Sequence, residues 1–160
     1  MPYKALEFVK TEVERVLKAG AIRRSKSPYS SHIVIVPKNS ALGDPPKFRL
    51  YIEYRCLNDQ TKKDAFPIPR HQDLLHRLAK ACFFSSLDLA FGYHLVPLAQ
   101  DAVQKSAFSA PFGQFEFLIM AFGRSNGMAS FFRLMNRIFP ERLDKDILVY
   151  LDDIIIFTES

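Results

Sequence analysis

Three aspartates interrupt otherwise apolar segments of this 160-residue chain and are its best candidates for chemistry. Asp88 lies in an aromatic and aliphatic run, and Asp152 and Asp153 stand between two runs of Ile, Leu, Val and Tyr. A buried, unpaired carboxylate is strongly disfavoured, and neighbouring carboxylates raise one another's pKa. A divalent cation would relieve both costs, and oxygen ligands suit Mg²⁺ or Mn²⁺. If the three converge, two such ions could activate an attacking oxygen and stabilise a leaving one in phosphoryl transfer.

A structural explanation for the same residues stays open. Aspartate is a common turn residue because its side chain accepts hydrogen bonds from nearby backbone amides. Asp152 and Asp153 could form only a solvated hairpin turn, and Asp88 could cap a helix that follows it. The spacing along the chain does not prove that the three carboxylates converge.

The segments that must position these aspartates have the pattern of β-strands. Residues 82–89 predict a buried strand that carries Asp88. Residues 147–151 and 154–157 are β-prone runs separated by two residues, which predicts a tight hairpin with Asp152 and Asp153 at its tip.

The remaining pattern mixes helices and strands without a regular βαβ alternation, which indicates an α+β fold with an antiparallel sheet and packed helices. The spacing of apolar residues predicts helices over 5–19, around Leu74 to Leu78, and over 128–139. The alternation of apolar and polar residues predicts paired strands at 32–37 and 47–55, joined by the loop 39–46. A hairpin is predicted around residues 111–113.

Composition excludes several classes of protein. The chain is 48% hydrophobic, with 15 Phe, 6 Tyr and no Trp, so it can bury a core. Its apolar runs are shorter than the ~18 to 20 residues of a membrane-spanning helix. Only Cys56 and Cys82 occur, which excludes a disulfide scaffold and predicts an intracellular protein, with the compartment undetermined.

The net charge of +5 is unevenly distributed. Residues 1–63 hold 13 Lys and Arg against 6 Asp and Glu, whereas residues 64–160 hold 9 against 11. A basic lobe beside an acidic lobe suits a protein that binds a polyanion with one part and cations with the other, although mild basicity also serves solubility.

The aspartates lie in motifs that resemble the reverse transcriptases of long-terminal-repeat retrotransposons and retroviruses, most similar to the Ty3/gypsy type. Tyr150-Leu151-Asp152-Asp153 and Ser86-Leu87-Asp88-Leu89 carry the resemblance, with Gly92-Tyr93-His94 close behind the second motif. Further matching blocks follow the family's order: Arg49 to Asn58, Phe66 to Arg70, Lys105 to Phe108, Phe112-Gly113, Phe115 to Phe117, Phe122-Gly123 and Ser125-Asn126.

The resemblance implies a right-hand polymerase fragment, with fingers at about 1–62 and 98–119 and partial palm at about 63–97 and 120–160. The thumb and ribonuclease H domain are expected to be absent. Asp88, Asp152 and Asp153, with the backbone carbonyl of Leu89, would bind two Mg²⁺ ions, with Mn²⁺ as a substitute. The primer 3′-hydroxyl would attack a deoxynucleoside triphosphate.

The same resemblance assigns nucleotide contacts to Arg49, Tyr93 and Phe122, and weaker nucleic-acid contacts to Arg55 and Lys105. For Arg49 the alternative is a surface ion pair with Glu53. Tyr93 and Phe122 could instead be core aromatic residues, and Arg55 and Lys105 could lie on a solvated face or in structural salt bridges. The expected partners are an RNA or DNA template with its primer and deoxynucleoside triphosphates, with no membrane.

Departures from the family pattern leave a different class of function open. Relatives have an apolar residue at the position of Arg124, and the arginine costs packing unless its side chain reaches solvent. Gly127 adds backbone freedom that the relatives do not have at this position. The alternatives are a catalytically inactive remnant that binds nucleic acid, and an interaction module that associates with itself or with missing polyprotein domains through exposed apolar area.

Overall fold

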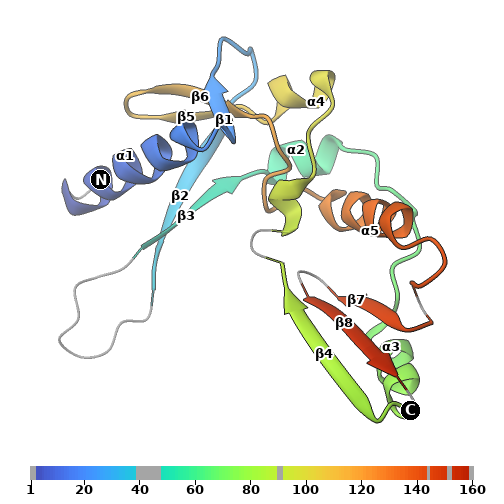
Figure 1. Ribbon diagram of the computed structural model, residues 1–160. Helices are drawn as coiled ribbons and strands as arrows, with labels where there is room; N and C mark the ends of the chain where they lie inside the picture. Colours follow the sequence, from blue (N-terminus) through green and yellow to red (C-terminus); the bar gives the residue numbers. More distant parts are fainter. Residues whose placement is uncertain (1–2, 39–47, 90–91, 144, 151–152, 159–160) are drawn as a thin grey trace. The chain divides into compact units, whose positions relative to one another are not determined.

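The computed structural model describes residues 3–38, 48–89, 92–143, 145–150 and 153–158. The chain divides into two compact units, each with one β-sheet (Figure 1). Unit 1 consists of Met1–Thr61 and Pro97–Arg124, and unit 2 consists of Lys62–Val96 and Ser125–Ser160. The chain therefore passes from one unit to the other three times.

Unit 1 is built on a five-stranded sheet in the order β1-β6-β5-β2-β3. Neighbouring strands are antiparallel except β2 and β5, which are parallel. The elements of this unit are α1 (Tyr3–Lys18), β1 (Ile22–Arg24), β2 (Ser31–Pro37), β3 (Phe48–Glu53), α2 (Arg55–Gln60), α4 (Gln100–Lys105), β5 (Phe108–Ala110) and β6 (Gly113–Phe117).

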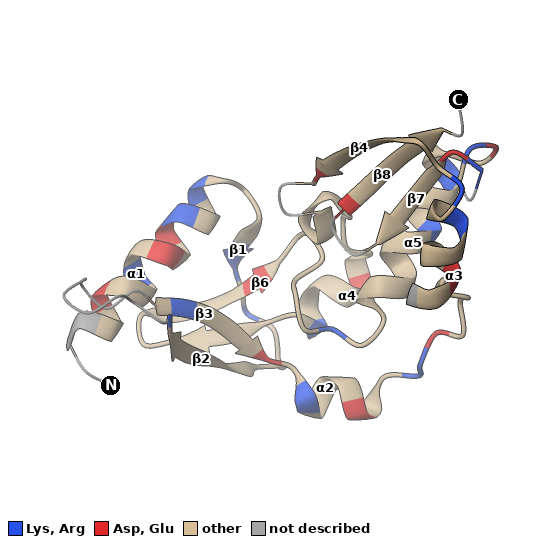
Figure 2. Cartoon of the chain, turned by 90° about the horizontal axis from the view of Figure 1, so that it is seen from below, with Lys and Arg blue, Asp and Glu red and all other residues tan. Residues whose placement is uncertain are grey.

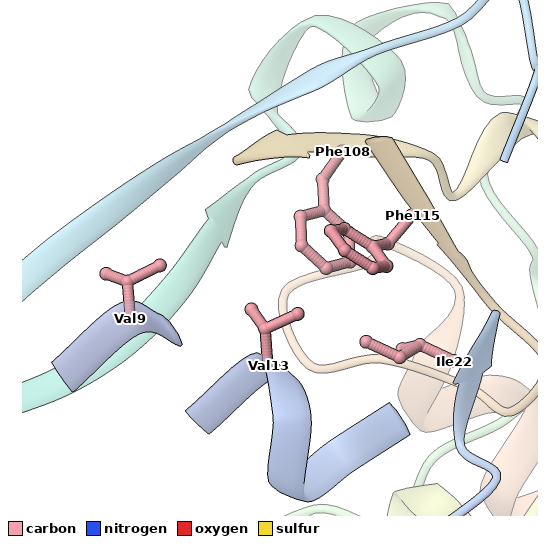
Figure 3. Close-up of a cluster of buried hydrophobic side chains, with 5 residues drawn as sticks. All are labelled: Val9, Val13, Ile22, Phe108 and Phe115. Atoms are coloured by element: carbon pink, nitrogen blue, oxygen red, sulfur yellow. The ribbon is translucent and has the colours of Figure 1, made fainter. Parts of the chain in front are cut away.

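Helix α1 packs its apolar stripe against this sheet, and the contact forms the core of unit 1. Val9 and Val13 of α1 face Ile22, Phe108 and Phe115 of the strands (Figure 3). Each of these five side chains is at most 2% exposed. The Phe108 and Phe115 rings are stacked with centroids 5.8 Å apart. Burial of each large apolar side chain stabilises the folded chain by about 1.5 to 3 kcal/mol.

A buried carboxylate joins β1 to β6 within unit 1. Glu116 is 5% exposed and accepts hydrogen bonds from Arg23 Nε at 2.7 Å and Ser25 Oγ at 2.6 Å. Burial by itself would raise the pKa of Glu116, but the Ser25 bond, the Arg23 bond and the Arg23 charge outweigh it, so the pKa lies below its ordinary value. The sequence pattern did not single out this pair.

Unit 2 is built on a three-stranded antiparallel sheet in the order β4-β8-β7. Leu74 of α3 packs with Leu148 of β7 and Phe157 of β8, and α5 lies beside β7 in both views (Figures 1 and 2). The elements are α3 (His71–Leu78), β4 (Phe83–Asp88), the 3₁₀ turn η1 (Gly92–Leu95), α5 (Gly127–Ile138), β7 (Ile147–Tyr150) and β8 (Asp153–Thr158).

Most of the predicted elements are confirmed, together with the α+β class. The helices predicted at 5–19, around Leu74 and at 128–139 are α1, α3 and α5, and the hairpin around 111–113 joins β5 to β6. Strands β2 and β3 pair as expected, but β3 ends at Glu53 and a helix begins at Arg55. The predicted loop 39–46 lies outside the described residues.

The prediction that residues 82–89 form a buried strand is wrong about burial. Strand β4 forms, but each of its residues is exposed, with Phe83 at 65% and Leu87 at 52%. Within its sheet β4 is an edge strand that pairs only with β8. An apolar run predicts burial only where another element covers it, and the side chains of β4 stay open to solvent.

The hairpin prediction is wrong by one residue. Asp153 is the first residue of β8 and pairs with Tyr150 across the hairpin, so Asp153 is a strand residue. The connection falls at residues 151–152, which lie outside the described part of the chain. Asp152 is one of these residues.

The basic excess belongs to unit 1, but unit 2 is neutral rather than acidic. Unit 1 holds 13 Lys and Arg against 8 Asp and Glu, and unit 2 holds 9 against 9. The difference from the expected partition arises because Lys62 and Lys63 belong to unit 2. Among the helices that the structure describes, none has the length and apolar character needed to cross a membrane.

Candidate active site

The structure places two of the three predicted catalytic carboxylates opposite each other. Asp88 ends β4 and Asp153 begins β8, and the two are direct partners in the antiparallel register, 65 residues apart in sequence. Directly opposed residues point to the same face of a sheet, with Cβ atoms about 4.5 to 5.5 Å apart. Figure 2 shows the acidic ends of the two strands side by side. The predicted convergence is therefore visible for this pair.

Like charges at directly opposed positions are destabilising, so this pair calls for a counter-charge. Asp88 and Asp153 are both exposed, which leaves their oxygens accessible to a cation. Across the described ranges no group of three His, Cys, Asp or Glu side chains could hold a metal ion, and the predicted third carboxylate, Asp152, lies outside those ranges. The full predicted metal set stays a prediction.

Two other predicted site residues follow β4 within unit 2. The Leu89 carbonyl, a predicted metal ligand, accepts a hydrogen bond from the Gly92 N–H at 3.2 Å, which leaves its second lone pair for another partner. Tyr93 lies in η1 and is half-buried, with its ring centroid 5.4 Å from that of Phe131. Part of the Tyr93 ring thus packs on α5.

The other predicted nucleotide-contacting residues lie in unit 1. Arg49 is exposed on β3, on the face opposite the half-buried Leu50, as its alternation predicts. Phe122 is 43% exposed, although the two residues before it, Met120 and Ala121, are buried. Part of the Phe122 ring is therefore open to solvent.

The predicted nucleic-acid contacts Arg55 and Lys105 both form ion pairs. Arg55 Nη2 lies 2.6 Å from Glu53 Oε2, and Lys105 Nζ lies 3.4 Å from Asp101 Oδ2. The Arg55 hydrogen bond lowers the pKa of Glu53, and the same bond raises the pKa of Arg55. Glu53, the alternative partner considered for Arg49, is therefore paired with Arg55. The neighbouring carboxylates offset the positive charges of Arg55 and Lys105, which weakens their attraction for phosphate.

Arg124 follows Phe122 and Gly123 and is partly buried. Burial lowers the pKa of its guanidinium, against the opposing charges of Tyr54 and Asp101. Its Nη1 is buried and finds no hydrogen-bond acceptor within the described part of the chain. The expected packing cost at this position is thus visible as an unsatisfied donor.

Two asparagines near these residues have roles that sequence reasoning did not assign. Asn58 Nδ2 donates to the Gly123 carbonyl at 2.7 Å within unit 1. Asn126 bridges the Lys62 carbonyl and the Asp64 N–H at 2.9 and 3.1 Å within unit 2. Both lie in the matched motif blocks, which was the available signal, and Asn126 also lies in the turn before α5.

The fold resembles that of solved retroviral enzymes. The foamy viral protease-reverse transcriptase in complex with an RNA/DNA hybrid matches the whole chain with a TM-score of 0.85 at 24% identity, over 21% of that protein. The native prototype foamy virus protease-reverse transcriptase matches 92% of the chain with a TM-score of 0.79 at 22% identity, over 19% of that protein. The predicted right-hand polymerase fold class is confirmed.

Sequence comparison leads to the same family. The profile of the reverse transcriptase (RNA-dependent DNA polymerase) family matches residues 36–160. The Pol polyproteins of the Drosophila melanogaster transposons 297 and gypsy are 43% and 42% identical over 95% and 96% of the chain. An RNA-directed DNA polymerase homolog of Oenothera berteroana is 44% identical over 69% of the chain and 78% of its own length. The chain belongs to the reverse transcriptase family.

The resemblance to the Ty3/gypsy type is thereby confirmed. The chain spans 14% and 15% of the lengths of the two Drosophila polyproteins.

Proposed function

We propose that the chain supplies the fingers and partial palm of an RNA-directed DNA polymerase. In this proposal unit 1 is the fingers and unit 2 is the palm. The reaction is nucleotidyl transfer from a deoxynucleoside triphosphate to a primer 3′-hydroxyl, with Asp88, Asp152 and Asp153 as catalytic residues. The observation that carries it is the register of β4 and β8, which sets Asp88 opposite Asp153.

The donor set fits the metal ions that reverse transcriptases use. Carboxylate and carbonyl oxygens suit Mg²⁺ or Mn²⁺, and Asp88, Asp152, Asp153 and the Leu89 carbonyl would hold two ions. Bound there, the ions would supply charge stabilisation to the attacking and leaving oxygens. The exposed carboxylates of Asp88 and Asp153 support this assignment because the β4–β8 register sets two like charges opposite each other, and a cation would offset their repulsion.

The remaining residues would bind and orient the substrates. The Arg49 guanidinium, exposed on β3, suits the triphosphate oxygens, and the exposed ring of Phe122 and the partly exposed ring of Tyr93 suit the sugar and base of the nucleotide. The net charge of +5 on unit 1 favours a template and primer through phosphate contacts. The ion pairs of Arg55 and Lys105 make these two residues weaker contributors.

A primer-extension assay on an RNA template with Mg²⁺ tests the proposal. We expect Asp88→Asn and Asp153→Asn to lower extension by at least about a hundredfold, because metal coordination supplies several kcal/mol of transition-state stabilisation. Asp73→Asn, at an exposed position on α3, is the matched control and should extend like the wild type. Extension that is equal in the wild type and both site variants would exclude catalysis by this chain.

A second candidate is an inactive module that binds nucleic acid or another protein. The basic excess of unit 1 needs no carboxylates to bind a polyanion, and Phe83, Phe84 and Leu87 of β4 are more than half exposed. Nucleic-acid binding that persists without metal and weakens steeply with salt, in the absence of extension, would favour this candidate. An apparent molar mass from light scattering that rises with protein concentration, and that no longer rises in Phe83→Ala, would indicate association through the apolar strand.

A further inference from the structure

The turn at Phe122-Gly123 is fastened by a side chain from another element. We propose that Asn58 is a positioning residue for the incoming nucleotide, because its amide holds the turn that presents Phe122. The inference rests on the function proposed above, in which Phe122 contacts the nucleotide. Asn58 would affect the bound nucleotide only through this turn.

The fastening bond is short and comes from a regular element. Asn58 lies in α2, where its backbone N–H donates to the Tyr54 carbonyl at 2.8 Å, and its side-chain Nδ2 donates to the Gly123 carbonyl at 2.7 Å. Tyr54 is 2% exposed, and its hydroxyl donates to the Ser106 carbonyl at 2.9 Å. The Asn58 side chain thus extends from a helix whose N-cap residue, Tyr54, is buried in unit 1.

The turn needs such a fastening because its backbone is unusual. Gly123 has φ +87°, a conformation that side-chain-bearing residues rarely adopt. A Cβ at this position would meet Ile52 O and Tyr54 Cδ2 only at 3.9 Å, so the backbone conformation and not crowding calls for glycine. The chain leaves the interior at this point, since Ala121 is 4% exposed and Phe122 is 43% exposed. The bond from Asn58 to the Gly123 carbonyl holds the backbone next to Phe122 and so contributes to the direction of its ring.

The chain beyond the turn has a separate anchor, so the effect of Asn58 can be isolated. Asn126 occupies the N-cap position of α5 but makes no side-chain capping bond there. Its amide instead bonds the Lys62 carbonyl and the Asp64 N–H. The start of α5 is therefore held within unit 2 without Asn58. Loss of the Asn58 bond should loosen the turn at Phe122-Gly123 and leave α5 in place.

Single-nucleotide incorporation by the full chain tests this role. We expect Asn58→Ala to raise the KM for the deoxynucleoside triphosphate about tenfold and to leave kcat within about threefold, since a hydrogen bond that positions a binding group is lost. Asn58→Asp, which keeps the side-chain shape but removes the amide donor, should also raise KM. The matched control is Asn136→Ala, because Asn136 is exposed on α5 and its amide donates to the Phe132 carbonyl of the same helix at 3.1 Å.

Hydrogen exchange provides a readout that does not depend on turnover. The peptide 120–126 should exchange faster in Asn58→Ala than in the wild type without any ligand, while peptides from α5 should not change. If Asn58→Ala does not fold, Gly123→Ala disturbs the same turn through its backbone and should give the same rise in KM.

The outcomes separate the two proposals. A wild-type chain that extends a primer, with the same KM in Asn58→Ala and Asn136→Ala, overturns the positioning role and leaves the proposed function intact. A wild-type chain that does not extend a primer overturns the proposed function and this inference with it. A raised KM together with faster exchange over 120–126 supports the positioning role.

Discussion

The two units place their charged residues in opposite ways. Unit 1 buries Glu116, which forms an ion pair with Arg23 and accepts a hydrogen bond from Ser25, within a sheet that α1 covers with apolar side chains. Unit 2 leaves Asp88 and Asp153 exposed and facing each other at the ends of two strands, and its edge strand is open along its whole length. A buried charge with bonded partners joins strands together, whereas two exposed like charges on opposed strands are the arrangement that the proposed metal site would use. The comparison shows that unit 1 pairs its buried carboxylate with a cation inside its sheet, whereas unit 2 leaves an opposed pair of carboxylates open to solvent.

The largest expected effect contrasts aromatic residues of the two sheets. Phe115→Ala should lower the free energy of unfolding by about 3 kcal/mol, because the ring is 2% exposed and stacks on Phe108. Phe83→Ala should change it by less than about 0.5 kcal/mol, because that ring is 65% exposed. Urea unfolding followed by circular dichroism measures both. Equal losses would mean that β4 is covered in solution, which would break the comparison.

A smaller effect should follow from the buried carboxylate of unit 1. Glu116→Gln should lower the free energy of unfolding at neutral pH by about 1 to 2 kcal/mol, since it weakens charge-assisted hydrogen bonds from Arg23 and Ser25. The pKa of Glu116 is lower in the folded chain than its ordinary 4.5. Its contribution is therefore fully present above pH 4.5 and is lost as the pH falls through the folded value.

Thermal unfolding between pH 7 and pH 3 checks this prediction. The acid-induced fall in stability should be smaller in Glu116→Gln than in the wild type, and Glu14→Gln, at an exposed position on α1, should behave like the wild type. A variant with the full wild-type pH dependence would show that the buried carboxylate does not set the acid sensitivity of unit 1.

The smallest effect should be a gain in stability. Arg124→Leu should raise the free energy of unfolding by about 1 kcal/mol, because it removes a desolvated guanidinium whose Nη1 has no acceptor among the described residues. Arg137→Leu, at an exposed position on α5, is the control and should give no gain. A loss of stability in Arg124→Leu, measured as a lower melting temperature, would mean that the guanidinium is satisfied in solution and that unit 1 tolerates a second buried charge.

The site was predictable where it depended on local pattern. The β-prone runs around Asp88 and Asp153 predicted strands, and the matched motifs predicted that these residues belong together. The burial of β4 could not be predicted, because an apolar run does not reveal whether another element covers it. The one-residue error at the hairpin arose because the run of two aspartates looked like a turn, while the strand pairing includes Asp153.

The amino-acid sequence was enough to indicate the family, most of the helices and strands, and the three aspartates of the predicted site, because motifs and periodicity are local properties of the chain. The tertiary structure decided which of these residues face each other, which charges are buried and which side chain holds the turn at Gly123. Those outcomes depend on contacts between residues far apart in the chain, such as Asn58 with Gly123 and Arg23 with Glu116. The free energy of each contact depends on how far the folded chain shields the two partners from water.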